Sequence, residues 1–178
     1  MKYFTFFIFI LALSACEKNN ELFSDSGDMK YGRVSAVLNG EDWLISAKAR
    51  INSQNSSLFY LYTYIYEYDG EYTSPKLRFH NIPTKVGTYR LKKIDAQSGI
   101  AAIIPSALMY INDDTPGNKY FLQDNKVSCV KVTEIDTVNN HVEGEFEIHL
   151  KIEGDKVLDN FPDNLCFRKG KFSADLLP

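Results

Sequence analysis

The segment 141-HVEGEFEIHLKIEGD-155 decides the fold. Apolar residues recur at every second position, and histidine and glutamate occupy positions between them. Side chains alternate between the two faces of a β-strand, so this pattern predicts a strand with one buried and one solvated face, as in an antiparallel sheet. The buried face is expected to carry Val142, Gly144, Phe146, Ile148, Leu150 and Ile152.

Similar short runs follow one another from residue 31 onward, separated by Asn, Asp, Gly and Pro. Asn39-Gly40 joins the runs 33-RVSAVL-38 and 42-DWLISAKA-49, and this dipeptide favours a two-residue hairpin turn. About nine to eleven antiparallel strands are expected, too many for one open sheet of this size. The sequence therefore predicts an all-β fold, either an antiparallel β-sandwich or a lipocalin-like barrel.

The chain begins with Lys2 and an apolar run from Tyr3 to Leu13. This run is shorter than the roughly 20 residues of a transmembrane helix, so residues 1–15 are expected to be a secretory signal peptide. Leu13-Ser14-Ala15-Cys16 resembles the bacterial lipobox, in which the cysteine is acylated. Residues 16–30 are expected to form the lipidated cysteine and a flexible tether, and residues 31–178 a single β domain.

Acylated Cys16 would attach the protein to a lipid bilayer of the cell envelope, because two or more acyl chains hold a protein firmly. The expected location is the outer membrane. The residues after Cys16 leave its periplasmic and its surface face equally open.

Composition narrows the function classes. The formal net charge is −3 and no basic stripe is present, which argues against a nucleic-acid partner. The sequence contains no nucleophile elbow, no zinc-binding helix motif and no glycine-rich phosphate loop, so we expect a noncatalytic protein without a cofactor. Carboxylate pairs assembled from distant strands keep a hydrolase as the least favoured alternative.

Cys129 and Cys166 are the cysteines that remain after Cys16. The exported compartment is oxidising, so they are candidates for a disulfide. The pairing depends on the strand order, which the sequence does not give, because Cα atoms more than about 7 Å apart cannot be bridged.

The polar face of the 141–155 strand carries His141, Glu143, Glu145, Glu147 and His149. The two histidines would lie about 26 Å apart along a strand and could not share one metal ion. We therefore interpret this face as solvated and expect no metal site.

The segment 58-LFYLYTYIYEYDGEY-72 places a tyrosine at every second position, namely Tyr60, Tyr62, Tyr64, Tyr66 and Tyr68. Phe59, Leu61 and Ile65 occupy the opposite face and are better suited to burial, so the tyrosines are expected to point outward. Exposed together, they would form a candidate binding surface for a glycan or a protein. The alternative is structural, because tyrosine also has high β propensity.

Three motifs resemble a family of small Bacteroidetes lipoproteins of unknown function, DUF6252. They are 34-VSAVLNGEDW-43, 86-VGTYRL-91, and the closing series 130-VKVTEID-136, 141-HVEGEFEIHL-150 and 167-FRKGKF-172. The resemblance implies an exported, anchored, β-rich domain and transfers no catalytic residue. The expected role is binding of a glycan, peptide or partner protein, and the alternative is a structural or assembly subunit of an envelope complex.

Overall fold

The computed structural model describes residues 30–64, 75–93, 105–111 and 117–178. Within these ranges no helix is long and apolar enough to cross a membrane. The strands are β1 (Gly32–Leu38), β2 (Glu41–Asn52), β3 (Asn55–Tyr64), β4 (Pro75–Pro83), β5 (Gly87–Arg90), β6 (Ser106–Ile111), β7 (Lys119–Leu122), β8 (Cys129–Asp136), β9 (His141–Ile152) and β10 (Asn164–Leu177). The signal peptide and nearly all of the predicted tether lie outside the described residues.

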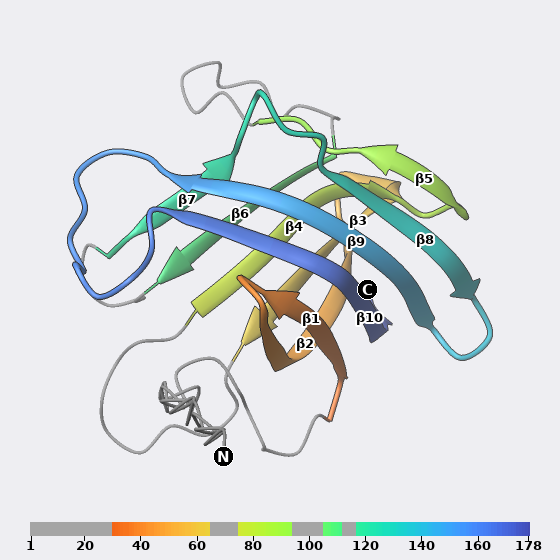
Figure 1. The fold of residues 1–178 in the computed structure, drawn as a ribbon. Coiled ribbons are helices and arrows are strands. Elements are labelled where there is room, and N and C mark those ends of the chain that lie inside the picture. The colour runs from red at the N-terminus through yellow and green to blue at the C-terminus, as the bar shows by residue number, and fades with distance from the viewer. Residues whose placement is uncertain (1–29, 65–74, 94–104, 112–116) are drawn as a thin grey trace, which may run out of the picture.

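Eight strands close into a barrel (Figure 1). Neighbours around the ring follow the order β1, β2, β3, β4, β6, β7, β9, β10, and β10 pairs back with β1. All of these pairs are antiparallel, and a two-residue parallel contact between β10 and β2 reinforces the closure. The all-β prediction is confirmed, and of its two architectures the structure has the barrel.

Strand β9 holds the two parts of the sheet together. β10 runs along one of its edges. The other edge is shared, because β8 pairs with the first half of β9 and β7 pairs with its last residues. β5 pairs with β8, so β5 and β8 form a flap outside the closed ring (Figure 1).

The pattern that predicted β9 is confirmed. Val142, Ile148 and Leu150 are fully buried, and Phe146 is 4% exposed. Ile152 is half-buried and packs against the same core. Between them, Glu145 and Glu147 are exposed, while His141, Glu143 and His149 are half-buried on the outer face.

The first hairpin forms at the predicted turn. Asn39 and Gly40 have φ angles of 51° and 98°, so both residues adopt the left-handed conformation of a tight hairpin turn. The Asn39 side chain also accepts a hydrogen bond from the Cys166 amide and donates one to the Asn164 carbonyl. These bonds fix the hairpin tip to the start of β10.

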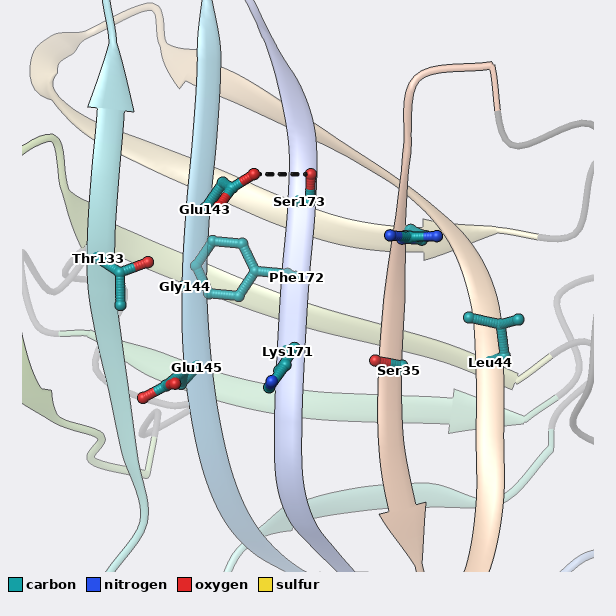
Figure 2. A pocket seen from close by; sticks show the side chains of 10 residues that line it. Ser35, Leu44, Thr133, Glu143, Gly144, Glu145, Lys171, Phe172 and Ser173 are labelled. Carbon is teal, nitrogen blue, oxygen red and sulfur yellow. Dashed lines mark hydrogen bonds between the residues drawn. The ribbon is translucent and has the colours of Figure 1, made fainter.

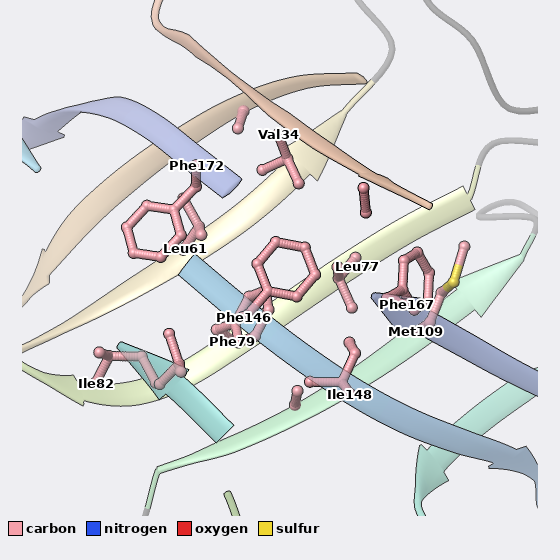
Figure 3. Packing of buried hydrophobic residues seen from close by; sticks show 14 of the residues in the cluster. Val34, Leu61, Leu77, Phe79, Ile82, Met109, Phe146, Ile148, Phe167 and Phe172 are labelled. Atoms are coloured by element: carbon pink, nitrogen blue, oxygen red, sulfur yellow. The ribbon is translucent and has the colours of Figure 1, made fainter. Parts of the chain in front are cut away.

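Apolar and aromatic side chains occupy the barrel interior (Figure 3). Trp43 packs edge-on against Phe167 at a centroid distance of 5.0 Å, and Phe79 packs edge-on against Phe146 at 5.1 Å. Edge-to-face pairs of this kind are worth about 0.5–1.5 kcal/mol beyond their area burial. The barrel is thus a packed core.

Two glycines make room for two of these rings. A Cβ atom at Gly170 would lie 2.5 Å from the Phe146 ring, and one at Gly144 would lie 2.2 Å from the Phe172 ring. Gly170 is the cross-strand partner of Phe146, and Gly144 is the partner of Phe172. A glycine on one strand therefore faces a phenylalanine on the other at two places. Gly144 of β9 faces Phe172 of β10, and Gly170 of β10 faces Phe146 of β9.

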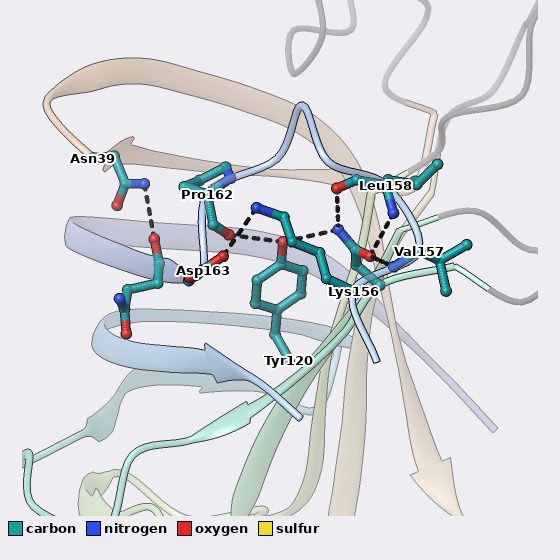
Figure 4. A network of polar contacts seen from close by, with 9 residues as sticks. Asn39, Tyr120, Lys156, Val157, Leu158, Pro162 and Asp163 are labelled. Atoms are coloured by element: carbon teal, nitrogen blue, oxygen red, sulfur yellow. Dashed lines mark hydrogen bonds and ion pairs between the residues drawn. The ribbon is translucent and has the colours of Figure 1, made fainter. Parts of the chain in front are cut away.

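The segment between β9 and β10 folds over one end of the barrel (Figure 4). Buried Asn118 accepts hydrogen bonds from the amides of Val157 and Leu158 through Oδ1. Tyr120, also buried, donates its hydroxyl to the Pro162 carbonyl at 2.9 Å, and Phe161 inserts into the core. Polar atoms at the end of the barrel are thereby satisfied while the core stays covered.

The candidate disulfide between Cys129 and Cys166 is not formed in this structure, where both residues are free thiols. Cys129 pairs with Glu147 on one edge of β9, and Cys166 pairs with His149 on the other edge. β9 therefore separates the two cysteines. Strands two places apart in a sheet lie about 9.6 Å from each other, beyond the reach of a disulfide.

Replacing Gly170 by alanine is expected to destabilise the protein by about 1–3 kcal/mol, because the new methyl group overlaps the Phe146 ring. Adding Phe146→Leu removes the overlapping atoms. The double variant should then lose less free energy of unfolding than the sum of the two single variants, measured by urea denaturation.

Gly144→Ala with Phe172→Leu is the matched control. A methyl group at position 144 also lies 2.4 Å from the Lys131 carbonyl oxygen, which belongs to the backbone and cannot be trimmed. This pair should show little rescue. Additive losses in the Gly170 and Phe146 pair would contradict the proposed packing.

Candidate functional site

The described tyrosines of the predicted surface point outward from β3. Tyr60, Tyr62 and Tyr64 are each half-buried, while Phe59 and Leu61 are 0% and 1% exposed on the inner face. The predicted orientation of this strand is therefore confirmed over its described part. Tyr66 and Tyr68 lie outside the described residues.

Basic side chains flank these tyrosines on both neighbouring strands. Lys48 on β2 is the cross-strand partner of Tyr62, and Arg78 on β4 is its partner on the other side. Arg50 on β2 is the partner of Tyr60. Partners in a sheet share a face, so all of these side chains project outward together.

The surface between these strands is hollowed. The hollow has a volume of about 500 Å³ and is lined by Arg50, Tyr60, Leu61, Tyr62, Arg78, Phe79 and His80. We call it the tyrosine hollow. Sequence reasoning missed Arg50, Arg78 and His80, because their proximity to the tyrosines depends on the pairing of β2 and β4 with β3.

Ring contacts position the cations. The Lys48 ammonium lies 5.1 Å from the Tyr62 ring centroid and 5.3 Å from that of Tyr64. The Arg78 guanidinium lies 5.5 Å from the Tyr110 ring centroid. Each cation–π contact of this kind contributes about 0.5–1 kcal/mol at an exposed site.

Tyr60 is held by two neighbours. The Asn52 side-chain amide donates a hydrogen bond to the Tyr60 hydroxyl at 2.8 Å. The Tyr60 ring packs edge-on against His80 at 5.5 Å. The register of β3 and β4 shifts at this point, and Asn81 adopts a positive φ of 57°. The pairing of Leu61 with Phe79 places His80 opposite Tyr60, and the shift accommodates the extra residue Asn81.

Burial and the neighbouring Arg78 charge lower the pKa of His80 below the usual 6.5. Both causes oppose the charged imidazolium. His80 is therefore neutral at pH 7, and its Nε2 atom is buried without a hydrogen-bond partner among the described residues.

A second hollow of about 410 Å³ lies on the outer face where β8, β9, β10, β1 and β2 run side by side (Figure 2). Glu143, Glu145, Lys171 and Arg33 line it, so charges of both signs mix on its walls. Lys131 forms an ion pair with Glu145 at 3.3 Å. Because these opposite charges already pair with one another, the electrostatic potential that would attract a charged ligand is weaker here than in the tyrosine hollow.

A serine, a histidine and an aspartate meet beside this second hollow. His141 Nε2 lies 2.9 Å from Ser173 Oγ, and His141 Nδ1 lies 3.5 Å from Asp175 Oδ1. These are the residue types of a hydrolytic triad. However, the Ser173 hydroxyl also donates to Glu143, whose negative charge would oppose a developing oxyanion.

The backbone around Ser173 also fails to supply an oxyanion hole. Ser173 pairs with Arg33 on one side and with Glu143 on the other, so its N–H belongs to the sheet ladder. We interpret the group as a surface hydrogen-bond network. No cluster of three or more metal-ligating side chains occurs in the described ranges.

No protein-family model, curated protein or solved structure matches this chain. The resemblance to the DUF6252 lipoproteins therefore stays a prediction from the sequence motifs.

The depressed pKa of His80 makes stability depend on pH. The unfolded chain binds a proton near pH 6.5 more readily than the folded protein, so the stability contributed above pH 6.5 is lost as the pH falls toward the folded-state pKa. The slope for one proton is at most about 1.4 kcal/mol per pH unit. Urea denaturation from pH 7.5 to 5.5 should show a smaller loss for His80→Gln than for the parent protein.

The parent protein and the variant differ in this one titratable group, so the difference between the two curves isolates His80. Parallel curves over this pH range would contradict the proposed burial of a neutral imidazole.

Proposed function

We propose that the protein is a noncatalytic lipoprotein of the cell envelope, anchored through Cys16, that binds a glycan, peptide or partner protein at the tyrosine hollow. The observation that supports this most directly is the row of Tyr60, Tyr62 and Tyr64, half-exposed on one face and bordered by a concave surface. Aromatic side chains that line a concavity contribute contact area at low entropic cost.

The filled barrel interior supports an external site. Phe79, Phe146 and Phe167 occupy the space that a ligand would take in an open barrel (Figure 3). The hollow is formed instead by β2, β3 and β4, which pair with neighbours on both sides. Ligand-binding side chains on such inner strands are held rigidly.

Tyr62→Ala is expected to weaken ligand binding at least tenfold, because Tyr62 lies between Lys48 and Arg78 at the centre of the row. The ligand would be found by screening the full chain against immobilised glycans and peptides, and affinity would then be measured by calorimetry. Tyr31→Ala is the matched control, since Tyr31 is half-buried and carries Lys30 over its ring but does not line the hollow. Equal losses in both variants would contradict the site.

Cys16 is expected to incorporate a fatty acid in a bacterial host. Metabolic labelling with an alkyne palmitate should mark the parent protein, and Cys16→Ser should remove the label and release the protein from membranes. Cys129→Ser and Cys166→Ser are controls that keep the label. A label that persists in Cys16→Ser would refute the proposed anchor.

A further inference from the structure

Positive charge gathers in the tyrosine hollow of an otherwise acidic protein. The chain has a formal net charge of −3. Yet the outward positions of β2 from Leu44 onward, and the described outward positions of β3 and β4, contain no aspartate or glutamate. They contribute Lys48, Arg50, Lys76 and Arg78 instead, of which Arg50 and Arg78 line the hollow.

Two of these cations, Lys48 and Arg78, are placed differently from other basic side chains of the protein, whereas Arg50 donates a hydrogen bond from Nε to the Pro178 oxygen at 3.2 Å. Lys93, Lys131 and Lys156 each form an ion pair with a carboxylate. Lys48 and Arg78, by contrast, contact the ring faces of Tyr62, Tyr64 and Tyr110, and none of their contacts in the described part of the chain is with a carboxylate. A guanidinium stacked on a ring keeps its edge N–H donors available.

We propose that the tyrosine hollow binds an acidic glycan, whose carboxylate is bound by Arg78 and Arg50 and whose sugar rings pack on Tyr60 and Tyr62. This inference rests on the proposed function and names the ligand class of the same site. An arginine fork matches a carboxylate through two parallel hydrogen bonds. Burial keeps His80 neutral, so the positive charge comes from the lysine and arginines.

The fold favours a glycan over an extended acidic peptide. Extended peptides commonly add a strand to an exposed sheet edge. β3 lies between β2 and β4, and β4 lies between β3 and β6, so neither strand offers an edge at the hollow. A ligand bound here contacts side chains on a sheet face, which suits flat sugar rings against tyrosine.

The test compares two probes that differ only in charge. The full chain is titrated by calorimetry with a tetramer of galacturonic acid and with its methyl ester. The acid is expected to bind at least tenfold more tightly than the ester. Raising the salt concentration should weaken the binding of the acid only. Equal affinities would overturn the acidic preference.

Two variants test which cation binds the carboxylate of the acid. Arg78→Gln is expected to lower affinity for the acid at least tenfold and to leave affinity for the ester unchanged. Lys171→Gln, an outward cation on β10 away from the tyrosine hollow, is the matched control and should bind as the parent does. Equal losses for Arg78→Gln and Lys171→Gln would overturn the assignment, and thermal melting of both variants confirms that they fold.

The outcomes separate this inference from the function on which it rests. Equal affinities for the acid and the ester, both lost in Tyr62→Ala and both kept in Arg78→Gln, would overturn the acidic ligand and support the glycan site. Binding of a tetraglutamate peptide in place of both sugars would overturn the glycan and retain a binding function. Binding of none of these probes, nor of any glycan or peptide in the screen, would overturn both.

Discussion

The pairing of a glycine with a phenylalanine across β9 and β10, which occurs twice, is the constraint on which the rest of the structure depends. Phe146 occupies the space above Gly170, and Phe172 the space above Gly144. Each ring fits only because its cross-strand partner has no side chain, so the two central strands can lie close while carrying large aromatic groups inward. The interior is filled as a result, and the tyrosine hollow lies on the outside of the barrel.

The outer face of β2, β3 and β4 combines ordered tyrosine rings with positive charge. Its tyrosines are ordered by the sheet beneath them and by contacts such as the hydrogen bond from Asn52 to Tyr60. Lys48 and Arg78 lie over tyrosine rings, which position the positive charge without neutralising it. A site arranged in this way needs little reorganisation to accept an anionic ring-shaped ligand.

The sequence predicted the features that depend on a single strand or turn. The alternation of β9, the Asn39-Gly40 turn and the outward direction of Tyr60, Tyr62 and Tyr64 follow from local periodicity and φ preferences. Strand order is not a local property. The sequence therefore decided neither whether Cys129 and Cys166 form a disulfide nor whether the fold is a barrel or a sandwich. For the same reason the sequence did not predict that Arg50 and Arg78 lie beside the tyrosines, because they are brought there by pairing across strands.

We propose that the barrel binds its ligand on the outer face while its interior stays closed. Nuclear magnetic resonance of the full chain with ¹³C-labelled tyrosine and phenylalanine rings, titrated with a galacturonic acid oligomer, tests this directly. Shifts are expected at Tyr60 and Tyr62, with Phe146 and Phe167 unchanged. Shifts centred on Phe146 and Phe167 would mean that the ligand enters the barrel and would contradict the account.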